Sequence, residues 1–181
     1  MRKEKCTKGR KDIYWKEGNI PDVVIAKLGV FEDDRGWLSE IFRSDETNKD
    51  VMPVMSYLSC TKPGVIRGPH EHIHQTDTFV FIAGKWMVRL WDARKDSKTF
   101  GTKKTVDVEF PVKVVVPPGV VHSYANISSK GGLVLNFPNK LYRGKNKAES
   151  PDEIRHEGSE TYCVKDLIPW WRGGWGNEFV C

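Results

Sequence analysis

The 181-residue sequence lacks the features that mark membrane-bound and secreted proteins. No apolar run approaches the roughly 18 residues of a membrane span, and no hydrophobic segment follows the charges at the N-terminus. We therefore expect no membrane association and a cytoplasmic location. Only four cysteines are present, scattered and without a Cys-x-x-Cys pair, which favours reduced thiols over a disulfide framework.

A net excess of positive charge is also confined to one end of the chain. The net charge is +5, but residues 1–17 alone contain seven Lys and Arg against three acidic residues, and the remainder is close to neutral. A nucleic-acid-binding protein usually spreads positive charge over the folded face that meets the phosphates. The sequence therefore predicts no nucleic-acid partner and a solvated basic arm.

The apolar residues that are present indicate an all-β fold. They occur in short bursts rich in Val, Ile, Phe and Trp between turn residues, and no window of 12 residues sustains a helical period. Short peripheral helices are expected only near residues 44–49 or 150–156. The expected strands cover residues 23–31, 37–42, 53–60, 77–84, 86–92, 106–110, 112–117 and 132–137.

The length fits one folded domain with peripheral ends. We expect a basic N-terminal arm over residues 1–21, a β-barrel over residues 22–160, and a Trp- and Gly-rich segment over residues 161–181 that packs on the barrel. Seven tryptophans in so small a β domain favour a barrel with rings lining its interior.

The densest chemistry lies in the stretch GVIRGPHEHIHQTD. His70 and His72 are two residues apart, so on an extended strand both side chains project to the same side. Asp77 follows in the same stretch, and His122 lies in a second one, PPGVVHSYAN. The spacing of these four residues resembles the two metal-site motifs of the cupin superfamily. The departures are Asp77 where Glu is usual and Pro111 where the second motif usually begins with Gly. The resemblance implies a cupin-type double-stranded β-helix, or jelly-roll barrel.

A second resemblance covers roughly residues 22–156. Five segments occur in order, namely DDRGWLSEIFR, GVIRGPH, WDARKDSKTFG, PPGVVHSY and NFPNKLY. Together they resemble the dTDP-4-dehydrorhamnose 3,5-epimerase family, a cupin branch that acts on nucleotide-linked 4-keto-6-deoxysugars. This resemblance implies a nucleotide diphosphate-sugar substrate, a homodimer and no cofactor.

The resemblance also implies residue roles. Epimerisation next to a ketone needs a base, an acid on the opposite face and stabilisation of the enolate. The base would be His70, the proton donor Tyr142, and the carboxylate orienting the base Asp166, although Asp77 and Glu71 are equally good partners. The expected substrate contacts are Arg35, Glu40, Arg67, His72, Gln75 and His122, and the guanidinium groups suit a diphosphate.

Two positions depart from this family pattern. His72 stands where the family usually has Gln, and Asp77 aligns with a Lys that stabilises the enolate. A carboxylate cannot take over that role directly. Either another donor does so, or a first-row divalent metal ion held by His70, His72, Asp77 and His122 supplies the charge, in which case His70 could not serve freely as base.

Three functions remain open from the sequence. The first is a cofactor-independent epimerase of nucleotide-linked keto-sugars, in a surface-polysaccharide or antibiotic-sugar pathway. The second is a metal-dependent cupin, either a dioxygenase or an isomerase, that uses the four metal-motif residues. The third is a non-catalytic sugar-binding cupin.

Overall fold

A computed structural model describes residues 15–168 of the chain. Its larger sheet has six strands in the order β1 (Lys16–Glu17), β9 (Thr102–Glu109), β8 (Lys85–Asp92), β11 (Val120–Asn126), β6 (Ile66–Glu71) and β13 (Ile154–Arg155). Only the β1–β9 pair of this sheet is parallel.

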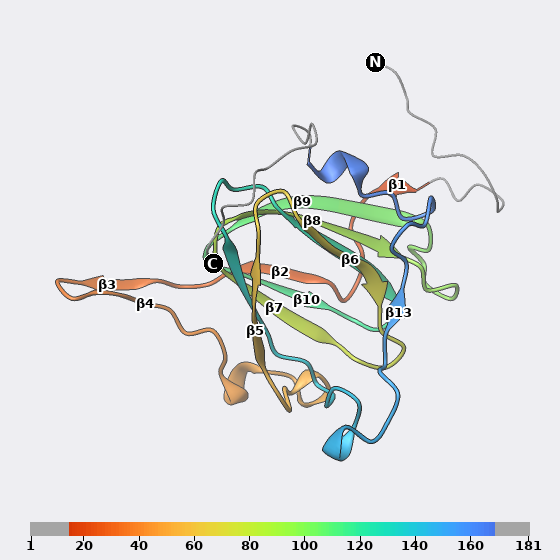
Figure 1. Cartoon of the computed structure of the whole chain (residues 1–181). Coiled ribbons are helices and arrows are strands. Elements are labelled where there is room, and N and C mark those ends of the chain that lie inside the picture. The colour runs from red at the N-terminus through yellow and green to blue at the C-terminus, as the bar shows by residue number, and fades with distance from the viewer. Residues whose placement is uncertain (1–14, 169–181) are drawn as a thin grey trace.

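The second sheet is antiparallel and has five strands. Their order is β2 (Val24–Lys27), β10 (Val112–Val116), β7 (Asp77–Ala83), β12 (Gly132–Asn136) and β5 (Tyr57–Thr61). The two sheets face each other as the layers of a jelly roll (Figure 1). A hairpin of β3 (Phe31–Asp33) and β4 (Gly36–Leu38) projects away from both layers.

The core lies between the facing sheets. Alternate residues of β8 point inward, and Trp86, Val88 and Leu90 pack against Phe79 and Phe81 of β7. Burying such a side chain contributes about 1.5–3 kcal/mol. The alternation leaves the intervening residues of the larger sheet on its outer face.

A smaller cluster covers that outer face. Leu167 and Ile168, in and after the 3-10 turn η4 (Lys165–Leu167), pack against Ala125, with Ile66 and Met87 at the edge. The remaining 3-10 turns of the described chain are η1 (Ser44–Glu46), η2 (Lys49–Val51) and η3 (Lys145–Lys147). The C-terminal segment thus reaches the barrel over its described part, and residues 169–181 lie outside the described residues.

The strand predictions hold for most of the barrel, with some differences. Neither β6 nor β11 was among the expected strand ranges, and a two-residue strand, β13, occupies part of the expected helix at 150–156. The expected boundary at residue 22 does not coincide with the edge of the fold, because β1 pairs with β9 and Ile20 is buried in the core. Residues 1–14 of the arm lie outside the described residues.

The prediction that the thiols are reduced is wrong for Cys60. Cys60 is disulfide-bonded, whereas Cys163 is free. Spacing along the chain could not reveal this bond, because pairing depends on which cysteines the fold brings together.

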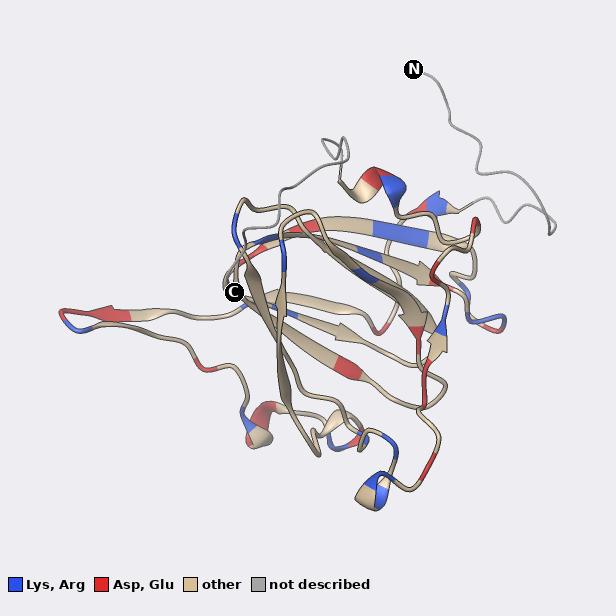
Figure 2. Cartoon of the chain, in the orientation of Figure 1, with Lys and Arg blue, Asp and Glu red and all other residues tan. Residues whose placement is uncertain are grey.

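In the view of Figure 2, charged residues of both signs are spread over the loops, the hairpin and the strands. Over residues 15–168, no helix is long and apolar enough to cross a membrane.

Candidate active site

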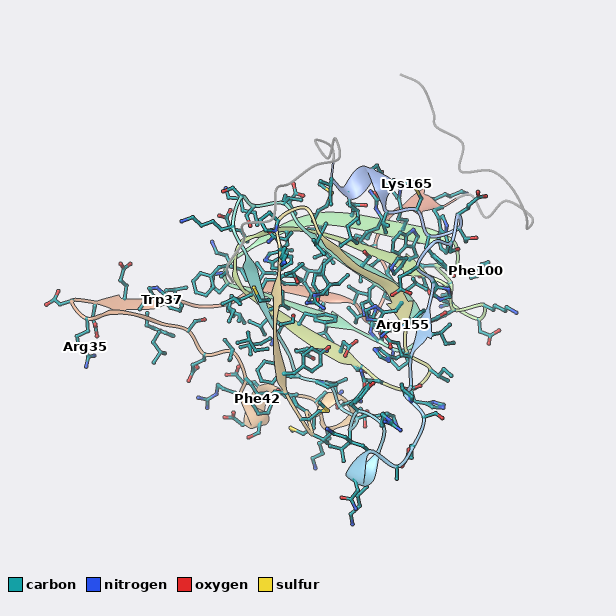
Figure 3. The ribbon with its side chains drawn as sticks, viewed as in Figure 1. Arg35, Trp37, Phe42, Phe100, Arg155 and Lys165 are labelled. Carbon is teal, nitrogen blue, oxygen red and sulfur yellow. The ribbon has the colours of Figure 1, made fainter. Side chains whose placement is uncertain are left out.

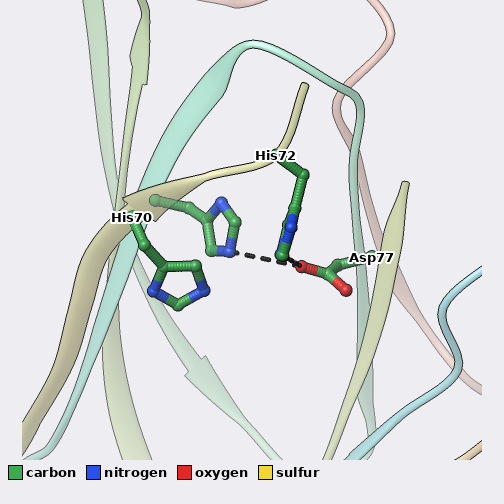
Figure 4. Close-up of side chains that lie close together, drawn as sticks. His70, His72 and Asp77 are labelled. Carbon is green, nitrogen blue, oxygen red and sulfur yellow. Dashed lines mark ion pairs between the residues drawn. The ribbon is translucent and has the colours of Figure 1, made fainter. Parts of the chain in front are cut away.

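Three histidines and one aspartate meet at one end of the barrel. His70 on β6 pairs directly with His122 on β11, and His72 follows at the end of β6. Asp77 is the first residue of β7, so the carboxylate comes from the opposite sheet. Figure 4 shows the side chains of His70, His72 and Asp77 gathered close together. The cluster therefore bridges the two layers, as the metal-motif spacing predicts.

The ligand-type atoms of the four side chains lie within 4.8 Å of one another. His72 Nε2 is 3.0 Å and His122 Nε2 is 3.4 Å from Asp77 Oδ2. The rings of His70 and His122 lie with their centroids 4.3 Å apart. Asp77 and His122 are buried, and His70 and His72 are half-buried.

The outward-facing atoms of three of these side chains are held by neighbours. His72 Nδ1 donates to the backbone carbonyl oxygen of Asp152, and His122 Nδ1 donates to that of Val120 at 3.1 Å. Asp77 Oδ1 accepts from the side-chain amides of Gln75 at 2.9 Å and Asn136 at 2.8 Å. The remaining atom of each side chain is thereby aimed at the centre of the cluster.

Burial and neighbouring charge set the protonation of the cluster. Burial, and then the nearby His122 and His72, lower the pKa of His70 to about 2, so its imidazole is neutral at pH 7. Burial lowers the pKa of His72, but the bond to Asp77 outweighs it and the net shift is upward. Burial raises the pKa of Asp77, and the contacts with His122 and His72 reverse this to a net decrease.

Gly68 allows the close approach of β6 to β11. Its φ of +81° lies in the region that favours glycine. A Cβ atom there would lie 2.5 Å from the carbonyl oxygen of His122 and 3.0 Å from His70 Nδ1. Steric crowding therefore explains why glycine stands at position 68, two residues before His70.

Arg67 and Tyr142 are two further residues that the sequence predicts for the site. Arg67 lies three residues before His70 on β6. Its guanidinium donates to Thr61 Oγ1 at 2.7 Å and to the carbonyl oxygen of Cys60 at 2.8 Å. Tyr142 is 55% exposed. Arg155, opposite His70 in the β13–β6 ladder, interacts electrostatically with both His70 and Tyr142.

Arg35 and Glu40 are not brought to the histidines of their own chain. Arg35 sits in the β3–β4 turn, with its side chain 90% exposed and 2.5 Å from Asp33, far from Arg155 (Figure 3). Glu40 pairs with Arg43 at 3.3 Å. It lines a surface pocket of about 200 Å³ between β2 and η1 that contains none of the cluster residues.

The structure does not bring Asp166 to His70. The Asp166 carboxylate binds the guanidinium of Arg89, with Oδ1 2.5 Å from Nη1 and Oδ2 3.1 Å from Nη2. Arg89 alternates with the inward-facing Val88 and Leu90, so this pair lies on the outer face of the sheet. The Lys165-Asp166 dipeptide matches the family pattern in sequence, but the strand alternation separates it from the base.

Three further residues were not among the expected site residues. Asn136 and Asp152 orient Asp77 and His72, and Tyr57 receives a hydrogen bond of 2.8 Å from Asn136. Burial raises the pKa of Tyr57 to about 12. No sequence signal marks these residues, because Asn136 lies 59 positions from Asp77 and only the β7–β12 pairing joins them.

Comparison with known proteins gives the family. The family model described as dTDP-4-dehydrorhamnose 3,5-epimerase matches residues 17–150. The probable low-salt glycan biosynthesis epimerase Agl13 of Haloferax volcanii is 40% identical over 140 residues, 76% of this chain and 87% of that protein. The spore coat polysaccharide biosynthesis protein SpsL of Bacillus subtilis is 33% identical over 138 residues, 75% of this chain and 88% of that protein.

Solved structures agree in fold. The dTDP-4-dehydrorhamnose 3,5-epimerase of Bacillus anthracis, solved with TDP and PPi bound, has a TM-score of 0.68 at 22% identity, covering 87% of this chain and 90% of that chain. The fold and the relatives define an isomerase-class epimerase built on a cupin-type barrel. The chain belongs to the dTDP-4-dehydrorhamnose 3,5-epimerase family. The predicted fold class and family are confirmed.

Proposed function

We propose that the protein epimerises a dTDP-linked 4-keto-6-deoxysugar by removing and returning a proton next to the ketone. The observation that carries the proposal is the family match over residues 17–150, a range that contains His70, the expected base. The relatives named for glycan and polysaccharide biosynthesis support a role in a pathway of that kind.

His70 is the proposed base. Its ring is half-buried and neutral at pH 7, because burial lowers its pKa, so a nitrogen is free to accept a proton. Among the described residues, no hydrogen bond holds either ring nitrogen of His70, in contrast to His72 and His122. The two other histidines are engaged with Asp77 and are less available to substrate.

Tyr142 is the proposed proton donor, and Arg67 and Arg155 are proposed to meet the substrate. Arg155 lies opposite His70 in the β13–β6 ladder and also interacts electrostatically with Tyr142, which supports placing base and donor in one neighbourhood. Arg67 comes three residues before His70 and can offer guanidinium donors to the diphosphate.

We also propose a homodimer in which the β3–β4 hairpin docks on a second copy. Phe31, Trp37 and Leu38 are 64%, 59% and 60% exposed on this hairpin. Exposed apolar side chains gathered on one projecting element favour a protein partner. If Arg35 contacts a diphosphate, it does so in the partner's site, because it lies far from the site of its own chain (Figure 3).

The absence of a cofactor stays a prediction, and so does its alternative, one divalent metal ion held by His70, His72, Asp77 and His122, whose ligand-type atoms lie within 4.8 Å of one another. The cytoplasmic location stays a prediction. The absence of nucleic-acid partners stays a prediction as well.

The test is product analysis. Purified protein is incubated with a dTDP-linked 4-keto-6-deoxysugar, and the product configuration is read by NMR. Inversion at one or both carbons next to the ketone is expected. If the sugar is unchanged but a titration shows that the nucleotide-sugar binds, the protein is a non-catalytic sugar-binding cupin and the proposed activity is wrong.

A further inference from the structure

Proton exchange next to a ketone needs a hydrogen-bond donor or a positive charge at the ketone oxygen, where the charge of the enolate develops. The carboxylate of Asp77, at the position where the family pattern has a lysine, cannot donate. His72 and His122 already donate their Nδ1 protons to backbone carbonyl oxygens, and their Nε2 atoms face Asp77 Oδ2. The donor therefore has to come from another side chain at this end of the barrel.

Tyr57 projects to the same side of its sheet as the cluster. It lies directly opposite Asn136 in the β12–β5 ladder, and opposed residues of an antiparallel pair have their side chains on the same face. Asn136 is buried and donates to Asp77 Oδ1, so this face is the barrel interior. Tyr57 is nevertheless 45% exposed, so its side chain is not sealed into the core.

The orientation of Asn136 leaves the hydroxyl proton of Tyr57 unused. An ionised carboxylate only accepts, so the amide atom 2.8 Å from Asp77 Oδ1 is Nδ2. The second hydrogen of Nδ2 goes to the hydroxyl oxygen of Tyr57, also 2.8 Å away. Within residues 15–168 the Tyr57 hydroxyl has no acceptor for its own proton. The hydroxyl is thus fixed by an incoming hydrogen bond, and its proton is available to a ligand.

The phenol keeps this proton at neutral pH and is joined to the base by a short series of contacts. Burial raises the pKa of Tyr57 to about 12 despite the hydrogen bond from Asn136, so the hydroxyl is protonated at pH 7. Asn136 links it to Asp77, and the Asp77 carboxylate lies within 4.8 Å of a ring nitrogen of His70.

We propose that the Tyr57 hydroxyl donates a hydrogen bond to the ketone oxygen of the sugar and stabilises the enolate that forms when His70 removes the adjacent proton. As the C–H bond breaks, its electron pair moves into the enolate, and the phenolic proton meets the charge on oxygen while staying on Tyr57. Tyr142 keeps its separate role of returning a proton to carbon. The inference rests on the proposed epimerase activity for its chemistry, but the hydrogen bond to the ketone is measurable without turnover.

The first test is Tyr57→Phe, which keeps the ring and removes only the hydroxyl. Loss of one donor to a developing oxyanion should lower kcat for deuterium exchange into the keto-sugar by about 10²–10³-fold and leave KM within about threefold. Tyr162→Phe is the matched control, because the Tyr162 ring packs against Trp91 on the outer face of the larger sheet. Its exchange should match the wild type. A fall of less than about tenfold in Tyr57→Phe would overturn the assignment.

The second test is infrared spectroscopy of the bound keto-sugar, isotope-labelled at the ketone carbon. A hydrogen bond lowers the C=O stretching frequency, so the band should lie lower in the wild type and Tyr162→Phe than in Tyr57→Phe. Equal frequencies in the wild type and Tyr57→Phe would overturn the contact. A lowered band that is lost in Tyr57→Phe, without deuterium exchange in the wild type, would contradict the epimerase activity alone. Failure of the wild type to bind the keto-sugar would overturn both.

Discussion

Asp77 is the residue at which this chain departs most from the pattern of its family. A carboxylate stands where the resemblance expects a lysine, and two histidines approach its Oδ2 atom. Burial of a carboxylate is costly unless charge and hydrogen bonds compensate, and here two amides donate to Oδ1 while His72 and His122 lie against Oδ2. The carboxylate at position 77 is therefore stabilised by several neighbours together, among them His72, rather than by one residue.

His70→Ala should reduce solvent-proton exchange into the keto-sugar by about 10²–10⁴-fold, because a general base contributes rate enhancement of that order. Nucleotide binding should change little. The readout is deuterium incorporation by NMR, with affinity from calorimetry, and His74→Ala as the control that keeps wild-type exchange. Exchange at the wild-type rate in His70→Ala would move the base to another residue.

At the scale of elements, most strands were predictable and β11 was not. Strands such as β7 and β8 are continuous or alternating apolar runs, and these patterns report burial directly. β11 is buried at every position, yet it contains His122, Ser123 and Asn126, which read as polar loop residues. Their burial depends on partners from distant strands, for example Arg67 and Thr61, which sequence alone does not identify.

The same reasoning separates the parts of the site that were predicted from those that were not. His70 and His72 share a side because of strand periodicity, and their meeting with Asp77 and His122 follows the motif spacing. The outer partners Asp152 and Asn136 depend on tertiary pairing. Asp166 was predicted for the site because the Lys165-Asp166 dipeptide matches the family pattern. The structure places it on the outer face of the larger sheet, away from His70.

Asp92, at the end of β8, should make the free energy of unfolding decrease at acidic pH. Asp92 is fully buried and accepts bonds from Arg94, Ser97 and Thr99 that outweigh burial and lower its pKa to about 2. The bonds favour the charged form, so their stabilisation is complete above the unfolded pKa near 4 and is lost as pH falls toward 2.

Asp92→Asn should therefore lower the free energy of unfolding at pH 7 by roughly 2 kcal/mol and flatten its dependence on pH between about 5 and 2. Urea denaturation at several pH values measures both. An unchanged slope in the variant would assign the acid sensitivity to other carboxylates.

The η4 turn gives a prediction that distinguishes structure from catalysis. Asp166→Asn removes a charged partner from Arg89, whose side chain is only 7% exposed, and should cost about 1–2 kcal/mol of stability. Deuterium exchange into substrate should stay within about twofold of the wild type, because the pair lies across the sheet from His70. A loss of exchange as large as that of His70→Ala, in a folded variant, would restore the catalytic role of Asp166.

At the scale of the whole molecule, the projecting hairpin is the feature that a monomer does not explain. Trp37→Ser with Leu38→Ser should shift the protein from dimer to monomer in light scattering after size exclusion, because both side chains lose apolar contact area. Substrate affinity should fall as well if Arg35 completes the partner's site. Lys98→Ser, in an exposed loop away from the hairpin, is the control, and a monomeric wild type would exclude the proposed assembly.

The central claim is that this barrel exchanges a proton next to a ketone, and one measurement tests it most directly. The wild-type protein is incubated in D₂O with a dTDP-linked 4-keto-6-deoxysugar and, separately, with the same sugar after reduction of its ketone. We predict deuterium at one or both carbons beside the ketone and none in the reduced sugar, whose C–H bonds are not acidic. No incorporation into the keto-sugar, with the sugar shown to bind, would contradict the account.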